Sequence, residues 1–261
     1  MGYFLQALAG TLRTGYTKKP GINSPFAQRV IQEVLFDTKK YGAYGRMLAA
    51  RQRYLHSQQQ VRVEDSGAGH RRGKTKEWRK VSDIVKRSSA PLKYHRLLYR
   101  ATRYFKPDIT LEAGTSLGLG TLALALGNPE GRVFTVEGDP ASARLARQLF
   151  EQQHLPNITL LNGTFREMFP KVFQQTHRLD LVFLDGHHEE EPTLEYFGAF
   201  LPRFHEKSIL VMDDIYWSRG MFRAWNTVRH HPSVSLSIDL FRTGILFFDP
   251  ELPQQTVRMR F

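Results

Sequence analysis

The chain has 261 residues, of which 41% are hydrophobic and none is cysteine, and its mean hydropathy is −0.41. This composition is typical of a globular protein that buries a core, and it excludes disulfides, thiolate metal sites and cysteine nucleophiles. The net charge of +12 is uneven: residues 1–110 carry 23 Lys and Arg against 7 Asp and Glu, whereas residues 111–261 carry 14 against 18. A basic front half suits nucleic acid, an anionic lipid or an acidic substrate, and it equally suits a solvated helical surface.

Targeting signals are not evident in the sequence. No stretch approaches the roughly 18 apolar residues that a membrane-spanning helix needs, so we predict no membrane span. The first 16 residues have only a short apolar run, without a charged lead or a clear cleavage site, so we predict no signal peptide. We therefore expect a cytoplasmic protein.

Residues 1–80 are predicted to form a basic, helical N-terminal extension. Residues 24–55 are expected to be helical, because Ser24 can cap a helix, Pro25 suits its first turn, and apolar residues follow near helical spacing. Residues 61–80 hold three glycines and seven Lys or Arg without a periodic apolar face, and this pattern predicts a loop. Such a loop could close over a site as a lid and bring Arg71, Arg72 and Lys74 to an anionic substrate.

Residues 81–261 are predicted to form a Rossmann-like domain. A helical stretch over 80–104 is interrupted at 88–91, where Ser89 and Pro91 look like a fresh cap and first turn. Short apolar runs then alternate with helical segments, which implies a doubly wound α/β fold with a mostly parallel, seven-stranded sheet. The last two strands are expected to form an antiparallel hairpin joined at 242–244. The seven predicted strands are 108–114, 132–139, 158–163, 179–186, 208–214, 234–241 and 244–250.

A glycine-rich turn follows the first of these strands, in the sequence LEAGTSLGLG at 111–120. Ligands of open α/β sheets bind beyond the carboxyl ends of the strands, where glycines let the backbone approach closely. Gly114, Gly118 and Gly120 are not spaced like the glycines of nicotinamide-binding turns. Glu112, two residues before the first glycine, would repel a pyrophosphate but would suit a cofactor with an ammonium group. Glu137, at the end of the next strand, is placed to accept hydrogen bonds from two ribose hydroxyls.

These two segments, with VEGDP at 136–140, resemble the first cofactor motifs of class I S-adenosylmethionine-dependent methyltransferases. The resemblance covers about residues 80–261 and includes the terminal hairpin, while Ala113 is a mild departure from the family's motif. It implies that the LLNGTF turn surrounds the adenine and that Asp185 lies near the methionine end. The cofactor-binding residues that we predict are Glu112, Gly114, Thr115, Ser116, Gly118, Glu137, Gly163, Thr164, Phe165, Asp185 and Ser89.

Part of the chain also resembles an uncharacterised bacterial subgroup of this family. The resemblance lies in the segments NSPFAQRV (23–30) and SDIVKRSSAP (82–91), together with the GAG sequence at 67–69.

Carboxylates are predicted to gather at two strand ends, with Asp185 at one and Asp213 and Asp214 at the other. Three neighbouring carboxylates repel one another unless a cation or a proton intervenes, and their oxygens suit Mg²⁺ or another hard divalent cation. The arrangement is similar in part to catechol-type O-methyltransferases, although an acid–acid pair stands where that group has an acid–amide pair. A metal held by Asp185, Asp213 and Asp214 is thus one expectation. The alternatives are that Asp213 caps the following helix and that Asp214 pairs with Arg219 or Arg223.

His188 is the candidate catalytic base, together with Asp185, because it stands where the catechol-type enzymes have a lysine. A histidine titrates near neutral pH and could take a proton from a hydroxyl as the methyl group arrives. The alternative is that His187 and His188 are solvated residues or partners of the acidic run at 189–191. Tyr216 and Trp217 could line a substrate pocket or could pack in the core.

The sequence thus predicts an S-adenosylmethionine-dependent methyltransferase whose partner is a small-molecule acceptor, with oxygen as the expected acceptor atom. One further possibility is a cofactor-binding structural or regulatory protein without turnover. The main alternative is a nucleic-acid methyltransferase or an RNA-binding protein that uses the basic front half. Against the alternative, the sequence contains no aromatic–basic stacking motif of known type and no tetrapeptide for a flipped base. A dimer is plausible, and the acceptor molecule cannot be read from the sequence.

Overall fold

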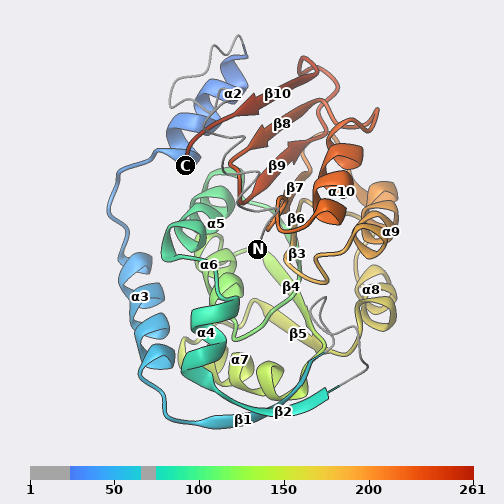
Figure 1. The fold of residues 1–261 in the computed structure, drawn as a ribbon. Coiled ribbons are helices and arrows are strands. Elements are labelled where there is room, and N and C mark those ends of the chain that lie inside the picture. Colours follow the sequence, from blue (N-terminus) through green and yellow to red (C-terminus); the bar gives the residue numbers. More distant parts are fainter. Residues whose placement is uncertain (1–23, 66–74) are drawn as a thin grey trace. The chain divides into compact units, whose positions relative to one another are not determined.

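The computed structural model describes residues 24–65 and 75–261 (Figure 1). These residues form two compact units: a central unit, Gln32–His177, and a C-terminal unit, Arg178–Phe261 together with the described residues up to Ile31. The boundaries between these units do not coincide with the domain boundary predicted between residues 80 and 81, which stays a prediction. Among the described helices, none is long and apolar enough to span a bilayer.

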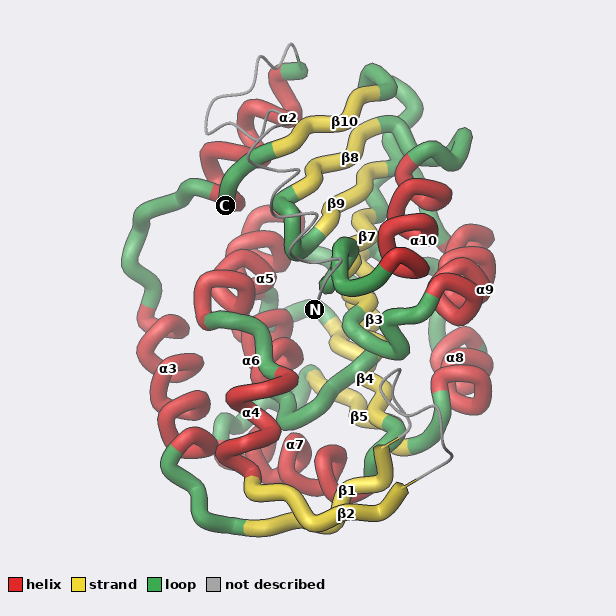
Figure 2. The backbone as a smooth tube through the Cα atoms, in the orientation of Figure 1, coloured by secondary structure: helices red, strands yellow, loops and turns green. Residues whose placement is uncertain are grey.

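The central unit contains three strands of the main sheet and the helices around them. Its described elements are, in chain order, a π-helical turn (Ile31–Leu35), α3 (Gly42–Leu55), β1 (Gln60–Asp65), β2 (Thr75–Lys80), α4 (Val81–Ser88), α5 (Leu92–Phe105), β3 (Ile109–Ala113), α6 (Leu119–Gly127), β4 (Arg132–Glu137), α7 (Pro140–Gln152), β5 (Ile158–Asn162) and α8 (Phe165–Phe173). Within this unit α3, α5 and α6 lie against one another (Figure 2).

Strands β3, β4 and β5 are parallel neighbours, so their carboxyl ends meet at one edge. The register places Glu112 beside Thr135 and Glu137 beside Asn162. Both faces of β3 and β4 are covered, as expected for parallel strands, and Phe134 is fully buried. The two predicted cofactor acids therefore lie at the ends of adjacent strands.

The C-terminal unit contains the other strands, in the order β6-β7-β9-β8-β10. β6 and β7 are parallel, β9 is antiparallel to both β7 and β8, and β10 is parallel to β8. The described elements of the unit are α2 (Pro25–Val30), β6 (Leu181–Leu184), α9 (Glu190–Phe200), a 3₁₀ turn (Leu201–Arg203), β7 (Ile209–Met212), α10 (Arg219–Arg229), β8 (Leu236–Asp239), β9 (Gly244–Phe247) and β10 (Gln255–Arg258).

The seven predicted strands are present as β3–β9, and the antiparallel β8–β9 hairpin is confirmed. Strand β10 was not predicted, because its four residues contain a single fully apolar side chain, Val257, that is buried. The helix predicted over 24–55 is capped by Ser24 as expected but ends after Leu35. Asp37 then accepts bonds from the Lys39 amide and the Tyr41 hydroxyl, which stabilises a turn before α3.

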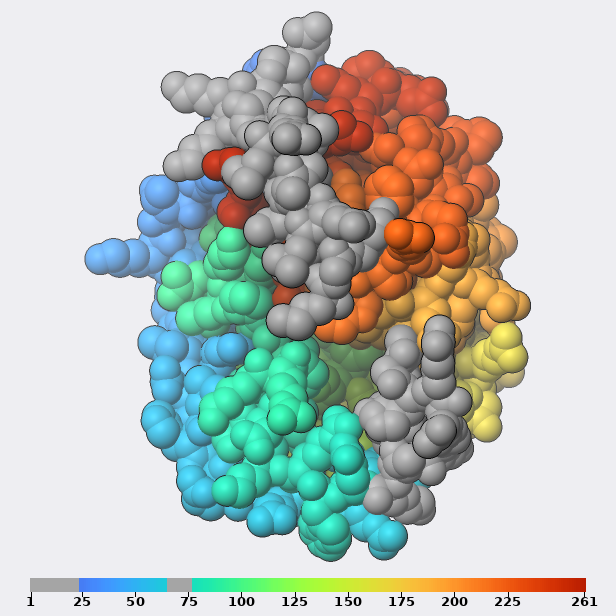
Figure 3. All heavy atoms as spheres, viewed as in Figure 1, coloured from blue at the N-terminus to red at the C-terminus, as the bar shows by residue number. Residues whose placement is uncertain are grey.

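The loop predicted over 61–80 is wrong for its described part, which forms the antiparallel β1–β2 hairpin. Val61 and Val63 alternate with more exposed residues and are buried, so the period-two pattern was present but short. Arg71, Arg72 and Lys74, predicted to act from a lid, lie outside the described residues. The hairpin leads into α4, which lies beside α3 on the face that Figure 3 presents. Trp78 on β2 is 67% exposed and pairs across the hairpin with Arg62.

Candidate functional site

The turn after β3 has the backbone geometry that its glycines predict. Gly114, Ser116 and Gly118 all have positive φ angles, of 107°, 49° and 81°. The amides of Gly114 and Thr115 both donate to the carbonyl of Val136 on β4, at 3.1 and 3.2 Å. These bonds fix the turn against the neighbouring strand at the edge where α6 begins.

Gly118 is required for packing as well as for its backbone angle. A Cβ atom there would lie 2.7 Å from the Phe150 ring and 3.1 Å from Ala146 on α7. We expect Gly118→Ala to lower the free energy of unfolding by about 1–3 kcal/mol, through left-handed strain and overpacking. Gly138→Ala is the matched control, because its Cβ would meet nothing within 4 Å. Equal denaturation midpoints for the two variants would contradict this explanation.

Glu112 is a buried carboxyl group with one oxygen satisfied and one not. Its Oε2 accepts from the hydroxyls of Thr121 and Thr135, the latter at 2.6 Å. Its Oε1 is buried and has no hydrogen-bond partner among the described residues. Burial raises the pKa of Glu112 to about 8, against the two threonine hydrogen bonds that lower it. An ammonium group of a ligand could donate the missing hydrogen bond to Oε1.

Glu137 connects the turns that follow β3 and β4. Its Oε2 accepts from the Ser116 amide at 2.6 Å, and its Oε1 accepts from the Asp139 amide at 2.8 Å. Burial raises the pKa of Glu137 to about 7, and these backbone hydrogen bonds oppose the shift. The Gly138 amide also bonds to this carboxylate. A carboxylate offers about four acceptor positions, so about one remains for the hydroxyls predicted to bind here.

Asp139 has a structural role that the sequence analysis missed. It caps α7 by accepting from the Ser142 amide at 2.7 Å, and it also accepts from the Glu64 amide of β1 at 2.9 Å. The helix cap was visible in the sequence as Asp-Pro, but the second bond comes from a residue 75 positions earlier. The N-terminal hairpin is thus hydrogen-bonded to the turn that holds Glu137.

The predicted adenine-binding turn follows β5. Gly163 has a φ of 153°, and its amide donates to the Glu137 carbonyl at 2.9 Å. Thr164 caps α8 in a reciprocal arrangement with Glu167, while the Phe165 ring is buried and stacks on Phe169 at 5.3 Å. The roles of these residues toward a ligand stay predictions.

Ser89 does not cap α5, which begins after Pro91. Its hydroxyl instead accepts from the Arg51 guanidinium at 2.9 Å, so α3 contacts the segment between α4 and α5. A cofactor-binding role for Ser89 stays a prediction.

In the C-terminal unit, the acid pair after β7 contacts Arg242, a residue of the β8–β9 turn. The Arg242 Nη2 lies 2.8 Å from Asp213 Oδ2 and 3.2 Å from Asp214 Oδ1, and its Nε donates to Asp213 at 3.1 Å. The Thr243 hydroxyl donates to the other oxygen of Asp213 at 2.7 Å. Burial and the neighbouring Asp213 charge raise the pKa of Asp214 to about 7, while Arg242 opposes the shift.

The alternatives weighed for the acid pair are both wrong. The cap of α10 is Ser218 and not Asp213, and Asp214 pairs with Arg242. Arg223 pairs instead with Glu190, on the exposed side of α10.

His188 lies beside Asp185 after β6, with Nε2 3.5 Å from Asp185 Oδ1. Burial lowers the pKa of His188, as do the charges of Arg242 and His187, whereas Asp213 raises it. The lowered pKa favours the neutral imidazole, which is the form that accepts a proton. His187 instead hydrogen-bonds the Tyr196 hydroxyl at 2.6 Å. Both histidines have positive φ angles, so the backbone after Asp185 turns sharply.

The predicted metal site does not fit these contacts. A divalent cation needs free carboxylate oxygens, yet both oxygens of Asp213 accept from Arg242 and one also accepts from Thr243. In the part of the chain that the structure describes, no group of three His, Asp or Glu side chains is arranged to hold a metal ion. Arg242 lies 29 residues after Asp213 and was not considered as its partner from the sequence. A metal held by Asp185, Asp213 and Asp214 stays a prediction that these contacts do not support.

Tyr216 and Trp217 differ in environment although they are adjacent. The Tyr216 hydroxyl donates to Asp239 at 2.7 Å, and its ring, which is half-buried, stacks on Phe222 and Phe241. Trp217 is 59% exposed and follows the acid pair directly in the chain. Its predicted contact with a substrate stays open.

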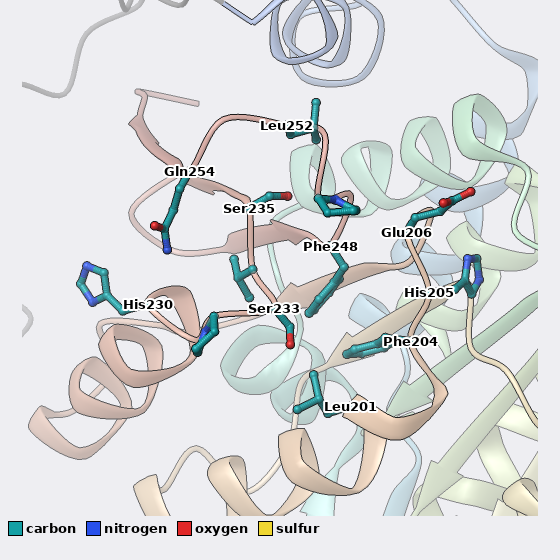
Figure 4. A pocket seen from close by; sticks show the side chains of 13 residues that line it. Leu201, Phe204, His205, Glu206, His230, Ser233, Ser235, Phe248, Leu252 and Gln254 are labelled. Carbon is teal, nitrogen blue, oxygen red and sulfur yellow. The ribbon is translucent and has the colours of Figure 1, made fainter.

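A cavity of about 740 Å³ lies elsewhere in the C-terminal unit. Figure 4 shows Phe204 and Phe248 near its centre, with ring centroids 4.5 Å apart. Its lining comes from segments that precede β7 and β8 and follow β9, whereas Asp185 and Asp213 follow β6 and β7. None of the predicted site residues lines this cavity.

Comparison with known proteins finds similarity to methyltransferases. Residues 111–215 match a family model described as a methyltransferase domain. A probable O-methyltransferase from Mycobacterium tuberculosis is 31% identical over 153 residues, which cover 51% of this chain and 65% of that protein. A transmembrane O-methyltransferase from Propithecus coquereli is 35% identical over 95 residues, or 34% of each chain. The matches therefore span less than two thirds of the length of these curated relatives.

Solved structures share the fold at low sequence identity. An O-methyltransferase from Bacillus cereus in complex with SAH has a TM-score of 0.56 and 16% identity, over 85% of this chain and 97% of that one. At this identity the likeness concerns the fold alone.

Proposed function

We propose that this chain, which carries a methyltransferase domain and has the class I S-adenosylmethionine-dependent methyltransferase fold, transfers a methyl group to an oxygen of a small molecule. The observation that carries the proposal is Glu112 Oε1, a buried oxygen without a partner among the described residues, beside the glycine turn. A cationic cofactor with an ammonium group would satisfy it. The names of the O-methyltransferase relatives support oxygen as the acceptor atom.

The residues of the central unit fit the cofactor by their chemistry. Glu112 would hold the ammonium group, and Glu137 would accept from the ribose hydroxyls while the Ser116 amide keeps its carboxylate oriented. The turn at Gly163 would lie against the adenine. When bound, S-adenosylmethionine would supply a methyl group attached to a positively charged sulfur, which passes to an oxygen nucleophile as the carbon–sulfur bond breaks and the demethylated cofactor leaves.

The residues of the C-terminal unit would handle the acceptor. His188 would accept the proton of the acceptor hydroxyl, since its lowered pKa keeps it neutral. Asp185, whose Oδ1 lies 3.5 Å from Nε2, would stabilise the imidazolium once the proton has been taken. Positioning of the nucleophile in line with the methyl group would also contribute to the acceleration. No step of this proposal uses a divalent cation.

Calorimetry with S-adenosylmethionine and with its demethylated product tests the cofactor part of the proposal. We expect both to bind and to raise the melting temperature, because any ligand of the folded state stabilises it. Absence of heat and of a thermal shift with both ligands would refute the proposal. Incubating the protein with metabolite extracts and S-adenosylmethionine, and searching for products heavier by one methylene, would then identify the acceptor.

A further inference from the structure

Two adjacent carboxylates at the end of β7 share one cation that belongs to the chain itself. Asp213 is 2% exposed and Asp214 is partly buried, so their mutual repulsion is weakly screened. Arg242 contacts both, and Asp185 also acts on its charge. These three carboxylates are the same ones that a divalent cation would have to neutralise.

The β8–β9 turn is built to hold Arg242 in this place. The Asp239 side chain is fully buried, accepts from the Phe241 amide at 2.9 Å, and accepts from the Tyr216 hydroxyl. Phe241 has a φ of 73° and stacks on the Tyr216 ring. The Arg242 carbonyl accepts from the Ile215 amide at 3.0 Å, next to the acid pair. The turn and the segment after β7 are therefore bonded to each other on both sides of Arg242.

Replacement of this guanidinium by a metal ion would be unfavourable. Arg242 is permanently charged, its Nε and Nη2 both donate to Asp213 Oδ2, and its Nε also reaches Oδ1 at 3.3 Å. Mg²⁺ would need near-ideal octahedral oxygen ligands and gives up its water reluctantly. A metal would have to displace both Arg242 and the Thr243 hydroxyl from Asp213.

We infer that Arg242 is a positioning residue that serves as the built-in counter-cation of Asp213 and Asp214, so that the protein neither binds nor requires a divalent cation there. Arg242 acts through Asp213 and Asp214, and holds the segment after β7 in one conformation. The positioning role of Arg242 in methyl transfer rests on the proposed function. The neutralisation of Asp213 and Asp214 without a divalent cation does not depend on it.

The test uses Mg²⁺ and Mn²⁺ alone as probes and the melting temperature of the full chain as the readout. For the wild type we expect no shift with millimolar Mg²⁺ or Mn²⁺ and none with EDTA. Arg242→Ala should lower the melting temperature, and either cation should restore part of the loss, because the carboxylates have lost their counter-charge. Arg242→Lys keeps the charge and should stay insensitive to both cations. Arg223→Ala, which removes an exposed partner of Glu190, is the matched control and should show neither effect.

Two results would overturn the inference. One is a cation-dependent rise in the wild-type melting temperature as large as that of Arg242→Ala. The other is a folded Arg242→Ala protein whose melting temperature does not change when either cation is added, because Arg242 would then act by packing alone. If Arg242→Ala does not fold, the wild type and Arg242→Lys are compared instead. A wild-type melting temperature that rises with either cation contradicts the inference. Melting temperatures of both proteins that do not change with either cation support it. Failure of S-adenosylmethionine to bind would refute the proposed function and leave this test intact.

Discussion

Binding of S-adenosylmethionine at pH 7 is expected to release a proton from Glu112, and Glu112→Gln should abolish that release and weaken binding by about 10–150-fold. The range corresponds to the loss of a hydrogen bond to a charged group, about 1.5–3 kcal/mol. Burial raises the pKa of Glu112 to about 8, so the free protein carries this proton predominantly at pH 7. An ammonium group beside the carboxyl favours its ionised form.

Calorimetric titrations in buffers of different ionisation enthalpy measure the released protons directly. Glu137, whose pKa is about 7, also contributes to the proton release, and it does so in both proteins. The difference in proton release between wild type and variant therefore reports Glu112 alone. The Gln side chain keeps an oxygen that can accept from Thr121 and Thr135, which protects the fold. Glu130→Gln, at an exposed position, is the control. Equal proton release by wild type and Glu112→Gln would show that another group titrates.

The same shift fixes how Glu112 affects stability. Because its pKa is raised from 4.5 to about 8 on folding, the unfolded chain releases the proton first as pH rises. The contribution of Glu112 to the free energy of unfolding is therefore fully present below about pH 4.5 and declines until about pH 8. Bound cofactor, by favouring the ionised form, opposes this decline.

Asp213→Ala is expected to lower the free energy of unfolding by about 3–5 kcal/mol, the cost of removing one partner of a buried ion pair. The substitution leaves the Arg242 guanidinium and the Thr243 hydroxyl without their main acceptor. Urea denaturation measures the change, which should appear in the midpoint and leave the slope unaltered.

Glu190→Ala is the matched control, because it breaks an exposed pair with Arg223 in the same unit. Pairs of this kind contribute about 0–1 kcal/mol. If both alanine variants lost the same stability, the Asp213–Arg242 contact would have no special role.

The sequence predicted the parts of the molecule that depend on neighbours in the chain. Apolar runs between helical segments predicted strands β3–β9. The glycine turn at 114–118 has the positive φ angles that glycines permit. Glu112 and Glu137 were placed correctly because parallel strands end at a common edge.

The missed features depend on partners that are distant in the sequence. Arg242 looked like an ordinary turn residue, and nothing local to it indicates that it contacts Asp213. The β1–β2 hairpin was missed because only two of six residues in β1, Val61 and Val63, give an apolar signal. Asp139 was read as part of a cofactor motif, while its bond to the Glu64 amide required the folded hairpin.

The bond between Asp139 and the Glu64 amide bears on how this protein can be divided for laboratory work. A fragment that starts at residue 81 would match the family-like part of the sequence but would lose the donor that Asp139 accepts from. It would also uncover the surface on which Val61 and Val63 are buried. Asp139 and Glu137 share a turn, so the loss would reach the proposed ribose contact. The N-terminal hairpin is therefore an integral part of the central unit and should be kept in any fragment of this protein.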